Sequence, residues 1–357
     1  MPNTTMAVPE MLQLLIDRMG SDLHLVAGYP PAIRVDGQLL AIDGQARLTK
    51  ESVEELVGSF MTQEQRDYVI VNREVDFSYQ YKNLGRFRVN SYYQQGILSA
   101  ALRLIPTQIK TIDELSLPPI FHDFTKYKQG LVLLTGPTGE GKSTTLAAII
   151  QEINQNRSDH IVTIEDPIEF VHVPERSIIS QREVHQDTNS WEIALRSALR
   201  EDPDVVLVGE MRDFETISAA ITVAETGHLV FATLHTNSAP QTIDRIIDVF
   251  PEHQQSQVRQ QLSLTLQAVV SQRLVPKISG GRIVATEIML ANSAVRNLIR
   301  EQKTYQLDNV IQTSSEQGMS LMESSLIQWA NRGAITFETA RMYAIRPDEF
   351  DRLSGKG

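Results

Sequence analysis

The chain of 357 residues contains no cysteine, and this absence excludes two kinds of structural element. Without thiols the chain forms no disulfide bond and builds no zinc site from thiolate ligands. No apolar run reaches the ~18 residues that a membrane-spanning helix needs. The segment 1–12 also lacks the basic stretch and apolar stretch of a secretory signal. We therefore expect a soluble, cytoplasmic protein with no transmembrane segment.

The chain also lacks an excess of basic residues. It carries 33 lysines and arginines against 44 aspartates and glutamates, a net charge of −11. A protein that grips nucleic acid over its surface is usually basic, so we expect no nucleic acid among its partners. The hydrophobic content of 41% is ample for packed cores. The length is typical of about two domains.

One local pattern predicts nucleotide binding. The apolar run 131–134 reads as a buried strand, residues 136–143 follow the spacing G-x-x-x-x-G-K-S, and the apolar stretch 146–153 reads as a helix. A glycine-rich turn between a strand and a helix is a P-loop, whose main-chain N–H groups surround phosphates. A chance glycine-rich turn is the alternative, and the strand–helix context disfavours it. The residues predicted to bind the triphosphate are Gly136, Pro137, Thr138, Gly139, Glu140, Gly141, Lys142, Ser143 and Thr144.

Two of these side chains have distinct predicted roles. Lys142 would neutralise charge on the β- and γ-phosphates, and the hydroxyl of Ser143 would bind Mg²⁺. The motif thus predicts ATP and Mg²⁺ as cofactors.

The first part of the chain, 1–104, predicts a small α+β domain with an antiparallel sheet. Residues 10–19 place Leu12, Leu15, Ile16 and Met19 on one helical face, with Gly20 ending the helix, and 50–71 also looks helical. Apolar and polar residues alternate in several short stretches, as in half-buried strands. These stretches are 23–25, 33–35, 75–81, 87–89 and 98–104, with a hairpin expected at Asp36–Gly37. The proline-containing segment 105–119 is predicted to be a linker.

The remainder, 120–357, alternates strands and helices. This order predicts a mostly parallel sheet covered by helices. Beyond Ser238 we expect mainly helices, and a mainly helical C-terminal part over 273–357. The predicted strands are 131–134, 161–164, 205–208, 229–234 and 283–289, and the predicted helices include 191–200, 214–224, 253–271, 292–302, 319–331 and 336–344.

Polar side chains follow three predicted strands. Glu165, Asp166 and Glu169 come after the first, Glu210 after the second and His235 after the third. The carboxyl ends of parallel strands meet at one edge, where such sheets bind ligands.

The chemistry of these strand-end residues predicts a different role for each. Glu210 reads as a Walker B acid that reaches Mg²⁺ through a water, and Glu169 as a water-activating base. Helix capping or surface ion pairing is the alternative for the carboxylates. His228 and His235 suit phosphate sensing or a subunit interface, and a packed histidine is their alternative. Arg88 and Arg103 lie on the polar face of the first domain, where a solvated role is the default.

Longer motifs resemble those of secretion ATPases. TIEDPIEF (163–170) resembles their Asp box, REDPDVVLVGEMRD (200–213) their Walker B segment and AETGHLVFATLHTNSA (224–239) their His box. With SDLHLVAGYPPAIRVDG (21–37), GRFRVN (85–90) and AVRNLIRE (294–301), the chain resembles the type IV pilus retraction ATPase family, the PilT family.

The resemblance implies a PAS-like N-terminal domain, a RecA-like ATPase domain and a homo-hexameric ring that hydrolyses ATP to retract pili. It implies work at the inner-membrane pilus base, with a platform protein and possibly a paralogous pilus ATPase as partners. AVRNLIRE is similar to a segment that the family links to retraction rather than to turnover. Matched to the family's motifs, the catalytic residues are Glu169 of the Asp box, Glu210 of Walker B, His228 and His235 of the His box, and Arg88 and Arg103, which approach the γ-phosphate.

Three rival functions remain at this point. A pilus extension or secretion ATPase typically adds N-terminal domains and a four-cysteine zinc motif, whereas this chain is expected to begin at the PAS-like domain and has no cysteine. A regulatory paralogue would bind ATP and assist a separate motor, but Lys142, Glu169 and Glu210 are intact. A nucleic-acid motor is disfavoured by the net negative charge.

Overall fold

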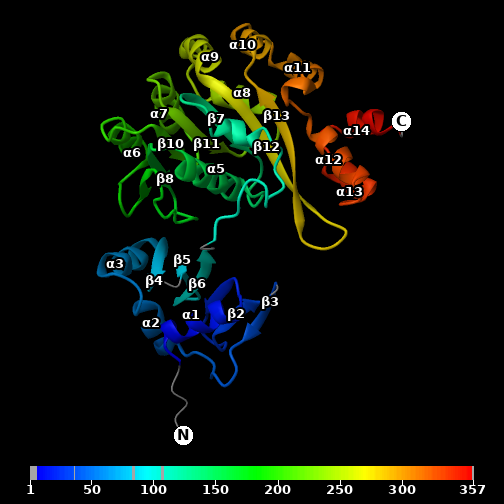
Figure 1. Ribbon diagram of the computed structural model, residues 1–357. Helices are drawn as coiled ribbons and strands as arrows, with labels where there is room; N and C mark the ends of the chain where they lie inside the picture. Colours follow the sequence, from blue (N-terminus) through cyan, green and yellow to red (C-terminus); the bar gives the residue numbers. More distant parts are fainter. Residues whose placement is uncertain (1–5, 36, 83–84, 106–107, 356–357) are drawn as a thin grey trace. The chain divides into compact units, whose positions relative to one another are not determined.

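The computed structural model describes residues 6–35, 37–82, 85–105 and 108–355 (Figure 1). The chain divides into two compact units. The first unit comprises Met1–Gln108 and Pro167–Val171, and the second comprises Ile109–Asp166 and His172–Gly357.

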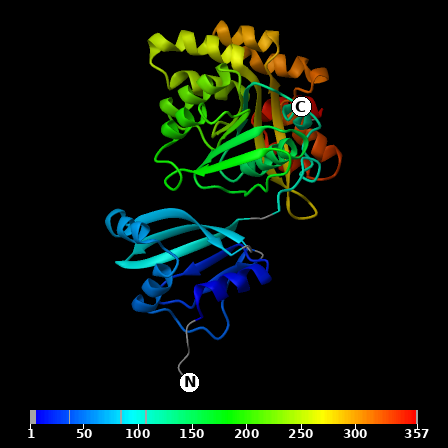
Figure 2. The same cartoon turned by 60° about the vertical axis from the view of Figure 1, so that its left-hand side comes forward.

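The first unit is built on an antiparallel sheet, as the alternating apolar pattern predicts (Figure 2). The strand order is β3-β2-β1-β6-β5-β4. Apolar side chains on one face of the sheet form a core with the helices, and Phe87, Val89 and Leu102 are fully buried in it. The elements are α1 (Val8–Asp17), β1 (Asp22–Leu25), β2 (Ala32–Val35), β3 (Gln38–Ala41), α2 (Lys50–Gly58), α3 (Gln63–Asn72), β4 (Glu74–Tyr81), β5 (Gly85–Gln94) and β6 (Ile97–Ile105). The finer likeness to a PAS domain stays a prediction.

Two expectations for this unit were wrong in detail. The single helix expected over 50–71 is two helices, because Thr62 begins a new one by accepting a hydrogen bond from the Gln65 N–H at 3.2 Å. Met19 was expected on the apolar face of α1, but it lies beyond the helix end and is 90% exposed. The chain turns there towards Gly20, where an added Cβ would lie 2.5 Å from Leu15. Asp36 of the expected hairpin lies outside the described residues.

The second unit contains a seven-stranded sheet in the order β13-β12-β7-β11-β10-β8-β9. Six neighbouring strands are parallel, and β13 pairs antiparallel with β12. The strands are β7 (Gly130–Thr135), β8 (His160–Glu165), β9 (Ile178–Glu183), β10 (Val205–Val208), β11 (Leu229–Leu234), β12 (Leu266–Pro276) and β13 (Arg282–Leu290).

Helices cover both faces of this sheet, so its central strands are buried on both sides. One core contains Leu131 and Leu133 of β7 with residues of α6 to α11, and the other contains Val132 and Leu134 with residues of α4 and α5. These helices are α4 (Phe121–Phe124), α5 (Lys142–Asn156), α6 (Trp191–Ala198), α7 (Phe214–Glu225), α8 (Ala239–Asp248), α9 (Glu252–Thr265), α10 (Ser293–Arg300) and α11 (Leu307–Thr313). The arrangement confirms the predicted parallel α/β architecture.

The C-terminal region differs from the sequence-based expectation. The predicted helix 253–271 ends at Thr265, and the chain continues as β12. The mainly helical part expected from 273 onwards therefore begins with the β12–β13 hairpin, beside which Figure 1 shows helices α12 (Met322–Asn331), α13 (Phe337–Tyr343) and α14 (Pro347–Ser354). β12 is buried on both faces and lacks a period of two, which explains the error. Strand β9 was also missed.

Part of the expected linker packs against the second unit. Ile112 is fully buried and Leu117 is 6% exposed, and both join the core that contains α4 and α5. The segment from Ile109 onwards consequently belongs to the second unit.

Candidate functional site

The P-loop connects β7 to α5 at the carboxyl edge of the seven-stranded sheet. Gly136 has a φ of 138°, Gly139 of 84° and Gly141 of 80°, values that favour glycine. At Gly136 an added Cβ would lie 2.4 Å from the Gln272 carbonyl oxygen, so only glycine fits beside β12. The loop backbone therefore depends on its glycines, as the motif predicts.

Lys142 is the first residue of α5 and is only 7% exposed. Its Nζ donates hydrogen bonds to the main-chain oxygens of Gly136 at 2.6 Å and Pro137 at 2.8 Å. These contacts hold the ammonium against the loop, at the helix N-terminus that favours anions. Ser143 follows in the first turn of the same helix. The local structure thus places a cation, a hydroxyl and a helix N-terminus together.

The ends of β10 and β11 bring Glu210 and His235 together. The Glu210 carboxylate lies 2.9 Å from His235 Nε2 and 2.7 Å from Arg212 Nη2. Burial acts to raise the pKa of Glu210, but Arg212 and His235 outweigh it and lower that pKa, so Glu210 is ionised at neutral pH. The other ring nitrogen of His235 lies 3.5 Å from the Thr138 hydroxyl. His235 therefore stands between the P-loop and the Walker B glutamate.

The two predicted histidines do not meet at this edge. His228 precedes β11 and His235 follows it, and β11 pairs in parallel with β7 from Leu229–Gly130 to Leu234–Thr135. The amino end of β7, rather than the P-loop, therefore lies beside His228, whose Nδ1 is 3.0 Å from the Thr226 hydroxyl. A strand of this length separates the two histidines by ~20 Å. The two histidines therefore lie at opposite ends of β11, and only His235 lies at the P-loop end.

The remaining predicted residues lie on other segments. Arg88 and Arg103 are cross-strand neighbours on β5 and β6 of the first unit, and Arg103 Nε lies 2.8 Å from the Asp22 carboxylate. Glu169 is exposed in the segment Pro167–Val171, which groups with the first unit. Glu165 ends β8 and accepts a hydrogen bond from the Thr163 hydroxyl at 2.7 Å.

Sequence reasoning missed Gln272 of β12, a fully buried polar residue that contacts the P-loop. The apolar pairs Val269–Val270 and Leu274–Val275 on either side of it are the signal that could have revealed the strand.

The site residues fit a magnesium–nucleotide complex. Within the described residues, no three histidine, aspartate or glutamate side chains form a group that could hold a metal ion. Mg²⁺ in P-loop proteins needs no such group, because phosphate oxygens and waters supply most of its ligands. The Ser143 hydroxyl would supply the direct protein ligand, and Glu210 would act through a water.

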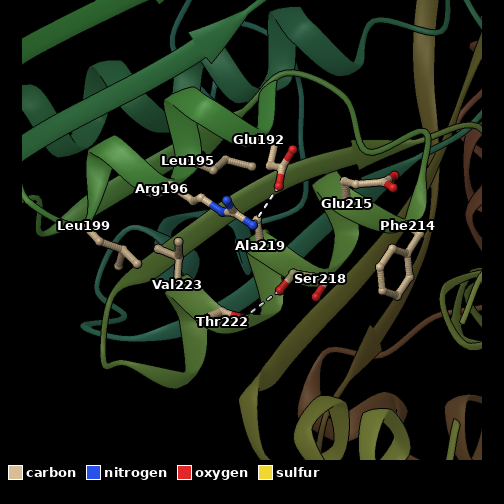
Figure 3. A pocket seen from close by; sticks show the side chains of 10 residues that line it. All are labelled: Glu192, Leu195, Arg196, Leu199, Phe214, Glu215, Ser218, Ala219, Thr222 and Val223. Atoms are coloured by element: carbon tan, nitrogen blue, oxygen red, sulfur yellow. Dashed lines mark hydrogen bonds and ion pairs between the residues drawn. The ribbon is translucent and has the colours of Figure 1, made fainter. Parts of the chain in front are cut away.

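A separate pocket of about 210 Å³ lies between α6 and α7 (Figure 3). Its apolar lining includes Leu195, Phe214 and Val223, and the ion pair of Glu192 and Arg196, 2.7 Å apart, borders it. The pocket lies on the helix layer rather than at the strand ends where the P-loop stands. The pocket is therefore distinct from the P-loop edge, where the motif predicts that nucleotide binds.

The P-loop on β7 and the acidic residue after β10 define a P-loop nucleotide-binding protein with a RecA-like sheet. The chain belongs to the Type II/IV secretion system protein family, whose model matches residues 86–341.

Close relatives extend this assignment. The chain is 48% identical to the "Type IV pilus retractation ATPase PilT" of Pseudomonas aeruginosa over 97% of this chain and 100% of that protein. It is 42% identical to the "Type IV pilus ATPase PilU" of the same organism over 95% of this chain and 89% of that protein. A crystal structure of the pilus retraction motor PilT with bound ADP matches 97% of this chain and 99% of that chain, with a TM-score of 0.91 and 48% identity.

Among the residues that the structure describes, no helix is both long and apolar enough to cross a bilayer.

Proposed function

We propose that the chain is an ATP-hydrolysing motor that drives retraction of type IV pili. The observation that carries this proposal is the line of contacts from Thr138 of the P-loop through His235 to Glu210. It joins the loop that would bind the transferred phosphate to the acid that would organise metal and water. The end-to-end similarity to a pilus retraction ATPase supplies the biological context.

Each residue of the P-loop edge has a distinct role in the proposed reaction. The main-chain N–H groups of the P-loop and Lys142 would bind the phosphates, Ser143 would hold Mg²⁺, and Glu210 would act on the metal through a water. Bound Mg²⁺ supplies positive charge that neutralises the β- and γ-phosphates. The Glu210 carboxylate fixes the His235 ring, so that a change at the γ-phosphate is transmitted from Thr138 to β11.

Three residues from the other segments complete the proposed site. Glu169 acts as the base that activates water. Arg88 and Arg103 stabilise charge on the transferring phosphoryl group. A conformational change coupled to hydrolysis would supply a mechanical stroke.

The proposal includes an assembly and a location. Such a conformational change does work on a filament only if neighbouring subunits are linked, and a homo-hexameric ring would supply that link. His228, at the opposite end of β11 from the P-loop, suits a role at a subunit interface. The ring would sit in the cytoplasm against the inner-membrane pilus platform protein, and a paralogous pilus ATPase would share this platform.

Replacing Glu210 by Gln tests the chemistry. The variant keeps the size of the side chain but loses the charge, so we expect turnover to fall by ~10²–10³ with little change in ATP affinity, because the charge acts mainly in the transition state. Steady-state ATPase rates and a nucleotide-binding titration measure the two quantities. Glu192→Gln is the matched control and should leave both unchanged. Equal losses of binding and turnover would contradict the catalytic role of Glu210.

A genetic experiment separates retraction from the rival functions. Deletion of the gene should leave cells with surplus surface pili and no twitching motility, and the wild-type gene but not the Glu210→Gln gene should restore twitching. Absence of surface pili in the deletion strain would instead indicate an extension ATPase. Purified wild-type protein without ATPase activity would indicate the regulatory paralogue.

A further inference from the structure

Strand β12 runs past the end of β7 and continues beside the P-loop. Ser271 is the last residue of β12 in register with β7, opposite Thr135, and their hydroxyl oxygens lie 2.8 Å apart. Gln272 therefore lies beside Gly136, the first residue of the loop. The main chain of β12 approaches so closely that an added Cβ on Gly136 would lie 2.4 Å from the Gln272 carbonyl oxygen.

The side chain of Gln272 contacts the other end of the same loop. It is fully buried, and its Nε2 donates a hydrogen bond to the Glu140 main-chain oxygen at 2.6 Å. Its Oε1 accepts a hydrogen bond from the Thr145 hydroxyl at 3.0 Å. One side-chain amide thereby joins the end of the P-loop to the first turn of α5, on either side of Gly141.

Glu140 returns the contact with its own side chain. Its carboxylate accepts a hydrogen bond from the Leu274 N–H, two residues beyond Gln272 on β12. Because β7 has already ended, this N–H has no neighbouring strand to pair with on that side, and the carboxylate takes that place. Glu140 on the loop is thus hydrogen-bonded through its main chain to the Gln272 side chain and through its side chain to the Leu274 main chain. We call these two hydrogen bonds the clasp.

We propose that Gln272 and Glu140 are positioning residues that hold the P-loop in the shape required for ATP. The proposal rests on the proposed ATPase function, because it concerns the binding of the same nucleotide. The loop binds phosphate through main-chain N–H groups, whose directions depend on the loop conformation. The neutral Gln272 amide fixes that conformation without adding charge beside Lys142.

Loss of the clasp should affect both ATP binding and turnover. A loop that is no longer held must be ordered when ATP binds, which raises KM. A small displacement of the bound phosphates also lowers kcat, because the reaction requires precise alignment. An effect confined to protein stability would not change KM.

The first test replaces Gln272 by Met, which preserves the side-chain length but removes both hydrogen bonds. We expect kcat/KM for ATP to fall about 10- to 100-fold with a clear rise in KM. Gln267→Met is the matched control, because Gln267 lies at the amino end of β12 and donates to the Gln129 main-chain oxygen at 3.2 Å. It should retain wild-type kinetics. Thermal unfolding with and without ADP should show a smaller ADP-induced stabilisation in Gln272→Met than in the control.

Glu140 gives a second test that does not depend on a core substitution. Glu140→Ala removes the acceptor for the Leu274 N–H and should raise KM, whereas Glu140→Gln keeps an acceptor oxygen and should restore most of the affinity. The double variant Gln272→Met/Glu140→Ala should lose less than the product of the two single losses, because both act on one loop.

The outcomes separate the clasp from the ATPase proposal. Wild-type KM and kcat in Gln272→Met would overturn the clasp while the ATPase function stands. If Gln272→Met fails to fold, equal and unchanged KM values in Glu140→Ala and Glu140→Gln would overturn it. Wild-type protein that neither binds nor hydrolyses ATP would instead overturn the proposed function.

Discussion

The second unit contains two groups of charged side chains that are built on different principles. At the nucleotide edge, Glu210 is 17% exposed and His235 42% exposed, and both belong to segments that follow strands. In the C-terminal region, Arg346 lies among Glu287, Glu323 and Asp308, and the side chains of Glu287 and Glu323 are fully buried. The first group is partly open to solvent, whereas the second contains two fully buried carboxylates whose cation, Arg346, is 23% exposed.

The charged residues around Arg346 are joined by short ion pairs and by hydrogen bonds from main-chain N–H groups. Arg346 lies 2.9 Å from Glu287, 3.2 Å from Glu323 and 2.6 Å from Asp308. The Ala239 N–H also donates to Glu287 at 2.8 Å, and the N–H groups of Ile345 and Arg346 donate to Glu323. Burial acts to lower the pKa of Arg346, but the charge of Glu287 and the other carboxylates outweighs it and raises that pKa. Arg346 is therefore permanently charged.

The two groups of charged side chains suit different purposes, one catalysis and the other stability. A charge that must respond to ATP needs an environment that can change, and loops at strand ends provide it. A buried charge is tolerated only when its partners are fixed, because an unpaired ion in the interior is costly. Variants in the two groups should consequently change different properties, and the following predictions test that separation in order of decreasing effect.

Lys142→Ala should cause the largest loss of activity. Without the ammonium the β- and γ-phosphate charges are not neutralised, so turnover should fall by more than ~10³, equivalent to ~4 kcal/mol of transition-state stabilisation. The melting temperature should fall less than in Arg346→Met, because the substitution removes two hydrogen bonds to loop carbonyls but leaves no buried charge unpaired. ATPase assays and thermal unfolding measure the two effects, with the exposed Lys126→Ala as control. A large drop in melting temperature would contradict the claim that Lys142 serves activity rather than stability.

Arg346→Met should chiefly reduce stability. The substitution leaves Glu287 and Glu323 buried without their cation, which should cost about 3–5 kcal/mol in the free energy of unfolding. Urea unfolding monitored by circular dichroism gives this value. Arg341→Met is the matched control, since Arg341 pairs with Asp351 at the surface and should change stability little. Stability equal to that of the control would show that the buried group contributes nothing to folding.

Acid should weaken the second unit through His172, which is 6% exposed and lies 3.1 Å from the Gln151 side-chain oxygen. Burial lowers its pKa from 6.5 to about 4. Between pH 6.5 and 4 His172 is protonated in the unfolded chain but neutral in the folded chain. The free energy of unfolding is therefore unaffected by this group above pH 6.5 and falls as the pH drops towards 4. The loss should approach ~3 kcal/mol.

His172→Leu checks this prediction by comparison with wild type. Urea unfolding at several pH values should show a shallower decline below pH 6.5 in the variant, while the exposed His253→Leu should follow the wild-type curve. Identical slopes in His172→Leu and wild type would assign the acid sensitivity to other groups.

The sequence predicted the nucleotide edge better than the contacts that support it. Lys142 and Ser143 belong to one short motif, and Glu210 and His235 each follow an apolar strand, so local patterns were sufficient. Gln272 could not be recognised, because its role arises only when β12 lies beside β7. Strand β12 itself is buried on both faces and its leucines also fit a helical period.

The ion pairs around Arg346 could not be predicted from the sequence for a similar reason. Glu287, Asp308, Glu323 and Arg346 come from separate elements, and nothing local distinguishes them from surface charges. The antiparallel sheet of the first unit was easier, because buried residues of β5 alternate with less buried ones over most of its length.

Arg296 in the AVRNLIRE segment is a charged residue of intermediate burial. Val295 and Ile299 of this segment are fully buried, so they form the apolar face of α10. Arg296 is half-buried, and its Nη1 donates to the main-chain oxygens of Ser263 at 2.6 Å and Leu264 at 2.9 Å. These are among the last carbonyls of α9, so Arg296 joins α10 to the end of that helix.

Arg296→Ala should therefore have the smallest effect of the series on the isolated protein. Removing these hydrogen bonds should cost about 1 kcal/mol of stability and leave ATPase activity within about twofold of wild type. We expect cells with this variant to display pili but not to retract them, because the α9–α10 junction would transmit motion rather than bind nucleotide. Arg300→Ala is the control for the isolated protein, since Arg300 is exposed on the same helix and makes a long contact, 3.4 Å, to Asn297. Normal twitching in the Arg296→Ala strain, or a loss of twitching that matches a loss of folded protein or turnover, would contradict this role.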